Sequence, residues 1–189
     1  MGKMTNPSWN SLLRKILAVL MGSTTMGNLG KNSSVLLLGA SGQLGQMLRF
    51  FWHAPPSLVS HSRQAHPEFI QFDLILEPEK ARAAMAGKHA VICLPGITNA
   101  NAAATGEVYS RNTDLALAAI KAAAQAGVPR VFLASSAAVY GATAGVQSET
   151  TTPPPIAPYG QAKLEMERAA LIAAGELGQA ITILRIGNV

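Results

Sequence analysis

Short apolar segments alternate with helix-forming segments from Val35 onward, and this alternation restricts the fold more than any other feature of the sequence. We expect strands at residues 35–38, 58–60, 69–72, 90–94, 131–134 and 181–184. We expect helices at residues 43–53, 78–85, 107–126 and 160–174, the last of them stopped by Gly175. Strands that alternate with helices predict right-handed crossovers and a doubly wound parallel sheet, which is an α/β fold in three αβα layers.

The composition fits one globular domain. The chain has 189 residues, of which 49% are hydrophobic and 13% are charged, and this balance excludes an intrinsically disordered chain. No apolar run reaches about 18 residues, so we expect no membrane-spanning segment. The one cysteine, Cys93, cannot form an internal disulfide. Nothing therefore calls for an oxidising compartment, and we expect a cytoplasmic protein.

The first 32 residues differ from the rest of the chain. Residues 22–34 are rich in Gly, Ser, Thr and Asn, which is typical of flexible linkers. We expect residues 1–32 to be a flexible extension and residues 33–189 to be the folded domain. Residues 1–67 carry six basic and no acidic side chains. They are scattered and no aromatic residues interleave them, so we expect no nucleic-acid partner.

A glycine-rich loop follows the first expected strand and opens the first expected helix. It reads Gly39-Ala-Ser41-Gly42-Gln43-Leu44-Gly45, a G-x-x-G-x-x-G variant of the dinucleotide fingerprint. The first glycine allows the tight turn, the second lets the backbone approach a pyrophosphate, and the third lets helix and strand pack closely. The helix N-terminus adds N–H donors and a positive dipole end. The loop predicts a Rossmann-type domain that binds a dinucleotide.

The end of the second expected strand bears on the choice of cofactor. A site that prefers NAD places Asp or Glu on the ribose 2′-hydroxyl about twenty residues after the loop. This chain instead reads Ser60-His61-Ser62-Arg63, with no carboxylate to repel a 2′-phosphate. Arg63 can pair with that phosphate, helped by Ser62. NADP is therefore favoured over NAD, although Arg63 as an ordinary solvated loop residue is the alternative.

Three further residues form a candidate catalytic set. Tyr159 and Lys163 are four residues apart on an expected helix, so both side chains can point into one cleft. A nearby ammonium would lower the tyrosine pKa, and such a tyrosine can exchange a proton with an alcohol or carbonyl. Ser136 lies where a parallel strand ends, the edge of the sheet where ligands bind, and could hold a substrate oxygen near Tyr159. No metal site is expected.

These motifs, in this order, resemble the extended short-chain dehydrogenase/reductases, the NAD-dependent epimerase/dehydratase family. The resemblance rests on the glycine loop, the SSAAVYG segment 135–141, the YGQAK segment 159–163 and the RIGNV segment 185–189. It covers residues 35–189. The resemblance implies that Ser136, Tyr159, Lys163 and Asn112 are catalytic, with Lys163 also binding the nicotinamide ribose and Asn112 supporting Lys163 through water.

The resemblance also implies ligand contacts. Asp73 would contact the adenine end of the cofactor, and Leu94, Pro95 and Gly96 would line it, although the family more often has small residues in place of the proline. Asn188 would touch the substrate. Family dehydratases usually carry a carboxylate just after the catalytic Ser or Thr, where this chain has Ala137 and Ala138, and this argues against a dehydratase.

The function expected from these residues and the resemblance is an NAD(P)-dependent oxidoreductase or epimerase. Its substrate would be a sugar nucleotide or a similar hydroxyl or carbonyl compound, with Tyr159 as acid/base. Family members continue into a substrate-binding lobe beyond the position of Val189. The alternatives are therefore a non-catalytic dinucleotide-binding module and an inactive fragment. Relatives dimerise through the helices that carry Asn112 and Tyr159, which implies a homodimer.

Overall fold

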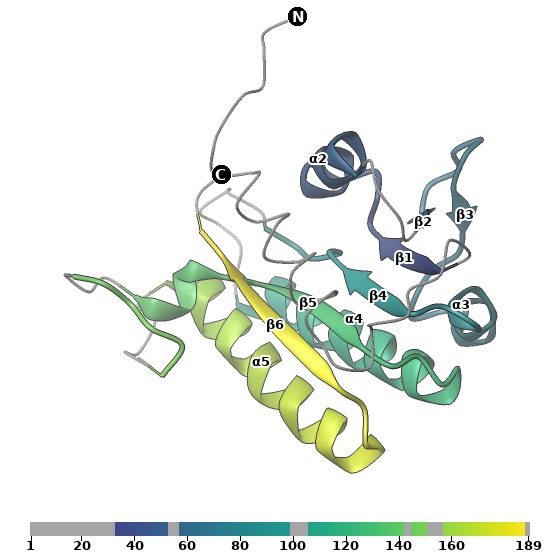
Figure 1. The fold of residues 1–189 in the computed structure, drawn as a ribbon. Coiled ribbons are helices and arrows are strands. Elements are labelled where there is room, and N and C mark those ends of the chain that lie inside the picture. The colour runs from purple at the N-terminus through teal and green to yellow at the C-terminus, as the bar shows by residue number, and fades with distance from the viewer. Residues whose placement is uncertain (1–32, 53–56, 99–105, 142–144, 151–156, 188–189) are drawn as a thin grey trace, which may run out of the picture.

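The computed structural model of the chain describes residues 33–52, 57–98, 106–141, 145–150 and 157–187 (Figure 1). Its strands form a parallel six-stranded sheet in the order β3-β2-β1-β4-β5-β6. The strand bounds are β1 Ser34–Leu38, β2 Ser57–Ser62, β3 Ile70–Gln71, β4 Ala90–Cys93, β5 Val131–Ser136 and β6 Ile181–Ile186. The expectations about residues 1–32 and Asn188 fall outside the described residues.

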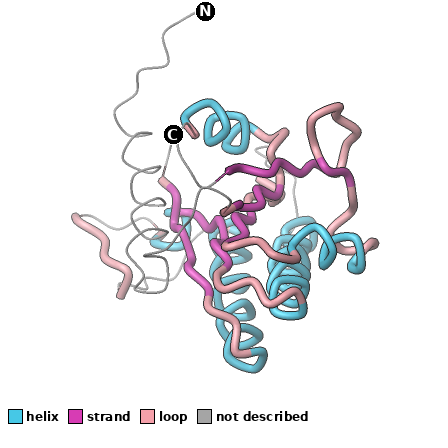
Figure 2. Tube along the Cα trace, turned by 45° about the vertical axis from the view of Figure 1, so that its right-hand side comes forward, coloured by secondary structure: helices cyan, strands magenta, loops and turns pink. Residues whose placement is uncertain are grey.

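Helices lie on both faces of the sheet (Figures 1 and 2). They are α2 Gln43–Phe51, α3 Pro78–Met85, α4 Gly106–Gln125 and α5 Pro158–Leu177, with a short 3₁₀ helix, η1 Ala137–Tyr140, after β5. One buried cluster joins the sheet to α3, α4 and α5, and a second joins its other face to α2. The doubly wound three-layer architecture is thereby confirmed. No helix within the described residues is long and apolar enough to cross a membrane.

The burial of the sheet explains why its central strands were predictable. All four residues of β4, and Val35–Leu38 of β1, are fully or almost fully buried, as in parallel strands covered by helices on both faces. The edge strand β3 contains only Ile70 and Gln71, both exposed, so the expected strand at residues 69–72 was too long. Phe72 is 1% exposed and belongs to the core but lies outside the strand, so an apolar residue need not mark where a strand ends.

The prediction that Gly175 stops the last helix was wrong. The helix α5 continues to Leu177, and Gly178 caps it in the left-handed conformation with φ of 63°. Its backbone N–H donates to the carbonyl groups of Ala174 and Gly175. Glycine inside a helix costs only about 1 kcal/mol relative to alanine, so a helix that packs against α4 and the sheet can include Gly175.

Candidate functional site

A cavity of about 820 Å³ lies at the carboxyl ends of β1, β2 and β4, the position where ligands bind in open parallel sheets. Eleven residues expected to bind the cofactor line it, while the expected contacts Tyr159 and Lys163 do not. The eleven are Gly39, Ser41, Gly42, Gln43, Leu44, Gly45, Arg63, Asp73, Leu94, Pro95 and Gly96. Segments distant in the sequence therefore converge on one site.

The glycine loop has the geometry that its sequence predicts. Gly39 turns with φ of 77°. A Cβ on Gly45 would lie 2.4 Å from the carbonyl oxygen of Gly39, so only glycine allows α2 to begin this close to the end of β1. Gly42 is the N-cap of α2, and the first turn contains no acidic residue. Unsatisfied N–H groups at a helix N-terminus favour anions, so this end of the cavity fits a pyrophosphate.

The expected cation at the end of β2 lies at the cavity, and Ser62 lines the same cavity with its hydroxyl already hydrogen-bonded. Arg63 is exposed and lines the cavity. Ser62 is 1% exposed; its hydroxyl hydrogen-bonds the Ser41 hydroxyl at 2.9 Å and accepts from the backbone N–H of Gln64. The serine therefore connects β2 to the glycine loop, and Arg63 is left as the group that could meet a 2′-phosphate.

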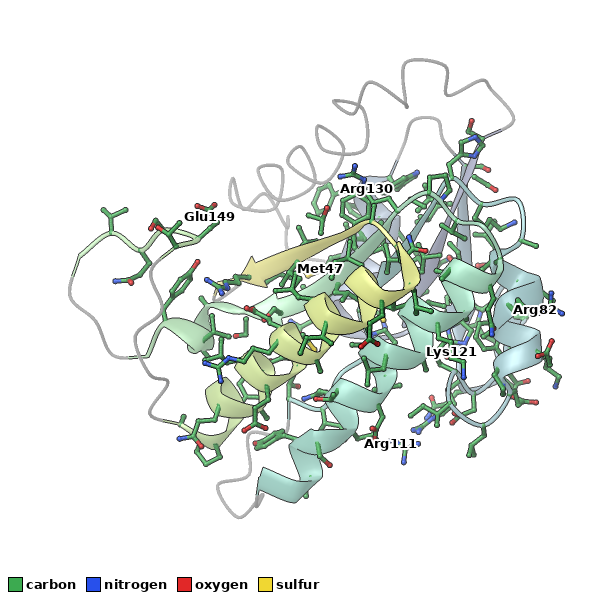
Figure 3. The ribbon with its side chains drawn as sticks, turned by 90° about the horizontal axis from the view of Figure 1, so that it is seen from below. Met47, Arg82, Arg111, Lys121, Arg130 and Glu149 are labelled. Atoms are coloured by element: carbon green, nitrogen blue, oxygen red, sulfur yellow. The ribbon has the colours of Figure 1, made fainter. Side chains whose placement is uncertain are left out.

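Asp73 is the acidic residue among the described residues that line the cavity. Its Oδ1 accepts hydrogen bonds from the backbone N–H groups of Ile75 and Leu76. The hydrogen bond from Leu76 is the main cause that lowers the pKa of Asp73, and the charges of Arg111 and Arg63 act in the same direction. The side chain of Arg111 extends from α4 (Figure 3) and lines the same cavity.

Tyr159 and Ser136 contact each other. Tyr159 lies in the first turn of α5 and is partly buried. Its side chain hydrogen-bonds Ser136, and its ring contacts the Tyr109 ring edge-on at a centroid distance of 5.5 Å. The Ser136 hydroxyl also accepts from the backbone N–H of Ala138, because Ser136 is the N-cap of η1. The cap fixes the serine hydroxyl at the end of β5.

Lys163 and Asn112 approach each other at Gly96. A Cβ on Gly96 would lie 3.2 Å from Asn112 Oδ1 and 3.4 Å from Lys163 Nζ. Lys163 is 3% exposed, and its ammonium donates to the carbonyl oxygen of Ala134 at 3.0 Å. The Asn112 amide accepts from the Ile97 N–H at 2.6 Å and donates to the Ile97 carbonyl at 3.2 Å. In this structure Asn112 thus holds the loop after β4.

Three causes act on the pKa of Tyr159 in this structure. Burial raises the pKa of Tyr159, the hydrogen bond with Ser136 lowers it, and the nearby Tyr109 raises it. Lys163 is not among these causes; its ammonium donates to the Ala134 carbonyl of β5. Burial also lowers the pKa of Lys163. Tyr159 is therefore a neutral phenol at neutral pH, the form that donates a proton.

Several residues of the cavity were not singled out from the sequence. They are His61, Gln64, Phe72, Leu74, Ile97, Thr98, Arg111 and Leu115. His61 is 3% exposed, its ring lies 3.8 Å from the Phe72 ring, and its Nε2 hydrogen-bonds the Phe72 carbonyl at 2.9 Å. Arg111 directly precedes Asn112, which the sequence had singled out, so its place near the site could have been predicted. The approach of Phe72 to His61 could not, because it depends on tertiary packing.

His61 should make the stability of the fold pH-dependent. Burial lowers its pKa below the ordinary 6.5, so the unfolded chain binds the proton more tightly than the folded chain. The free energy of unfolding should therefore decrease as pH falls from 6.5 toward the folded pKa. His61→Gln should flatten this dependence in urea unfolding between about pH 7.5 and 5.5. Replacing the exposed His66 by Gln is the control. If the free energy of unfolding of His61→Gln changes with pH as it does in the wild type, His61 is not the group responsible.

Comparisons with known proteins agree with this geometry. Residues 35–189 match the model of the NAD dependent epimerase/dehydratase family. A segment of 84 residues is 38% identical to UDP-glucose 4-epimerase of Azospirillum brasilense and covers 44% of this chain and 24% of that protein. The chain is also similar to MoeE5 in complex with UDP-glucose and NAD, with 30% identity, a TM-score of 0.66, and coverage of 80% of this chain and 52% of that one.

A further solved structure matches the fold. It is UDP-glucose 4-epimerase from Brucella ovis in complex with NAD, with 23% identity, a TM-score of 0.68, and coverage of 82% of this chain and 52% of that one. The chain spans about half the length of these solved proteins.

Proposed function

The chain belongs to the NAD-dependent epimerase/dehydratase family, and from this premise we propose that it is an NAD(P)-dependent oxidoreductase or epimerase. Its substrate is a sugar nucleotide or a similar hydroxyl or carbonyl compound. Tyr159 acts as the acid/base, Ser136 holds the reacting substrate oxygen, and Lys163 holds the nicotinamide ribose. Residues 33–189 form the dinucleotide-binding domain that carries this site.

One observation supports the proposal most strongly: the cavity lined by the glycine loop reaches Gly96, which lies against Lys163. Tyr159 stands one helical turn before Lys163 on α5. A dinucleotide whose pyrophosphate lies at the start of α2 would extend along the loop after β4 toward these side chains. The residues present therefore fit the group, and the reacting atoms would meet at Tyr159.

The side chains can then divide the chemistry between them. A bound nicotinamide would supply the hydride donor or acceptor. In the reductive direction, Tyr159 Oη donates its proton to the substrate carbonyl oxygen while a hydride reaches the carbonyl carbon. In the oxidative direction, Tyr159 would have to be deprotonated first, and its Oη would then accept the proton of the substrate hydroxyl as the same carbon gives up a hydride. Ser136, fixed by the Ala138 N–H, can donate a hydrogen bond to that substrate oxygen.

The reaction is tested with the whole chain, NADP⁺ or NAD⁺ and a panel of UDP-sugars. Two readouts suffice: absorbance of the reduced nicotinamide and ¹H NMR of the anomeric protons. Conversion of at least one sugar nucleotide is expected, with net reduction of the cofactor for an oxidoreductase and none for an epimerase. Cofactor binding without conversion of any panel member would contradict the catalytic proposal and favour a non-catalytic dinucleotide-binding module.

We further propose that NADP is preferred, because Arg63 lines the cavity at the end of β2 and Asp73 is the acidic residue among the described lining residues. Arg63→Ala should weaken NADPH binding about tenfold or more through loss of a charge-assisted hydrogen bond, with little change for NADH. Nicotinamide fluorescence titrations measure both. The matched control is Arg82→Ala on α3, which removes an exposed cation outside the cavity. Equal losses of affinity for NADPH and NADH in Arg63→Ala would contradict the proposal that Arg63 selects NADP.

Two further proposals concern assembly and location. The chain forms a homodimer through α4 and α5, where Val108, Leu171 and Ile172 expose apolar side chains, 41%, 58% and 64% exposed respectively. Sedimentation equilibrium tests this assembly, and a monomer at high concentration would contradict it.

The protein works in the cytoplasm, because its one cysteine needs no oxidising compartment. Fluorescence microscopy of the tagged protein tests that location.

A further inference from the structure

Three side chains of α5 contact the last three residues of β5. Tyr159, Lys163 and Glu167 are spaced four residues apart, so they lie along one side of the helix. Each binds one of the last three residues of β5: Tyr159 the Ser136 side chain, Lys163 the Ala134 carbonyl, and Glu167 the Ser135 hydroxyl. The proposed function uses the first two of these helix residues and assigns nothing to Glu167.

Glu167 is built into the fold as a buried anion. Its side chain is 5% exposed, and Arg185 of β6 binds it through two nitrogen atoms, with Nη2 at 2.8 Å from Oε2 and Nε at 3.1 Å from Oε1. The Arg185 guanidinium also lies 4.9 Å from the centroid of the Tyr140 ring and donates to the carbonyl of Glu149, which lies beyond the end of β6 (Figure 3). A buried carboxylate persists only with such partners.

Burial disfavours the protonated form of Lys163, and a nearby negative charge favours it. The charged and titratable groups that act on it are Cys93 on β4, Glu167 on α5, and, through Glu167, Arg185 on β6; Tyr159 stands one turn away on the same helix. Burial raises the pKa of Cys93 to about 12, so the thiol is neutral at neutral pH. Tyr159 is neutral as well. Among these groups Glu167 is left as the anion.

We propose that Glu167 is a positioning residue for the Tyr159–Lys163 pair. Its carboxylate, held by Ser135 and Arg185, fixes α5 against the end of β5 and supplies the negative charge one helical turn from the Lys163 ammonium. This inference rests on the proposed function for its catalytic meaning. The contact between Glu167 and β5 and the charge on Lys163 can be measured without any substrate.

The test is a pH titration of the Lys163 ammonium by NMR in the whole chain with ¹⁵N-labelled lysine. Glu167→Gln should lower the midpoint of Lys163 by about one pH unit, because an opposite charge one turn away favours the protonated form. Glu165→Gln is the matched control: it removes an exposed carboxylate two residues from Lys163 on the same helix and should leave the midpoint unchanged. Equal shifts in both variants, or none in Glu167→Gln, would overturn the proposal.

Two more variants separate charge from folding. Glu167→Asp keeps the charge and should retain most of the wild-type midpoint; a shift as large as in Glu167→Gln would count against the proposal. Glu167→Gln leaves Arg185 partly buried without its anion, so the double variant with Arg185→Met removes both charges and preserves the fold. Its Lys163 midpoint should stay low, and a return to the wild-type value would overturn the role of Glu167. If the midpoints change as expected but the wild-type chain converts no sugar nucleotide, the result would count against the proposed function alone.

Discussion

Tyr159→Phe is expected to bind NADPH as tightly as the wild type and to lose conversion of its sugar-nucleotide substrate about 100-fold or more. The reason is that the phenol oxygen is the proposed proton donor and acceptor, and removing a general acid–base group typically costs this much. The ring remains, so its contact with Tyr109 is preserved. Initial rates and fluorescence titrations on the same preparation separate turnover from binding.

The control for Tyr159→Phe is Tyr109→Phe. Tyr109 is 6% exposed, and its ring is the one that contacts Tyr159, so this variant removes a neighbouring hydroxyl and keeps the packing. It should lose far less turnover. Near-full activity in Tyr159→Phe, or equal losses in the two variants, would remove Tyr159 from the proposed mechanism while leaving the cofactor site intact.

Arg185→Met should lower the free energy of unfolding by about 3–5 kcal/mol, because it leaves the Glu167 carboxylate buried without its cation. Arg185 has a side-chain exposure of 17% and Glu167 one of 5%, so solvent cannot replace the lost partner. Equilibrium unfolding in urea measures the change.

The control for Arg185→Met is Arg82→Met on α3. Arg82 pairs with Glu79 at 2.8 Å, as short as the pair between Arg185 and Glu167, but the two side chains are 48% and 77% exposed. An exposed pair contributes little, about 0–1 kcal/mol. If both substitutions cost the same, burial of the Glu167–Arg185 pair would not be what stabilises the end of β6.

The fold could be predicted because its sheet is buried on both faces. In β1 and β4 the apolar runs coincide with the strands, and the glycines that open α2 fix where the first strand must end. The bounds failed at the edge strand β3, where Phe72 is buried in the core but lies outside the strand. They also failed at Gly175, where tertiary contacts of α5 outweigh a local stop signal.

The sequence likewise predicted one part of the site and not another. Residues whose position depends on the backbone path, such as Gly39, Arg63 and Gly96, line the cavity as the sequence predicted. Side-chain partners did not follow from spacing. Ser62 lines the cavity, but its hydroxyl hydrogen-bonds Ser41, and the Lys163 ammonium donates to the Ala134 carbonyl. Glu167 and Arg185 are 18 residues apart, and only the β5–β6 pairing brings them together.

Calorimetric titration of the 189-residue chain with NADPH, repeated with NADH, tests the central claim most directly. The account predicts one site for each folded chain, micromolar affinity for NADPH and weaker binding of NADH, because the glycine loop offers a pyrophosphate site and Arg63 stands at the end of β2. A chain that is folded by circular dichroism and binds neither nucleotide would contradict it.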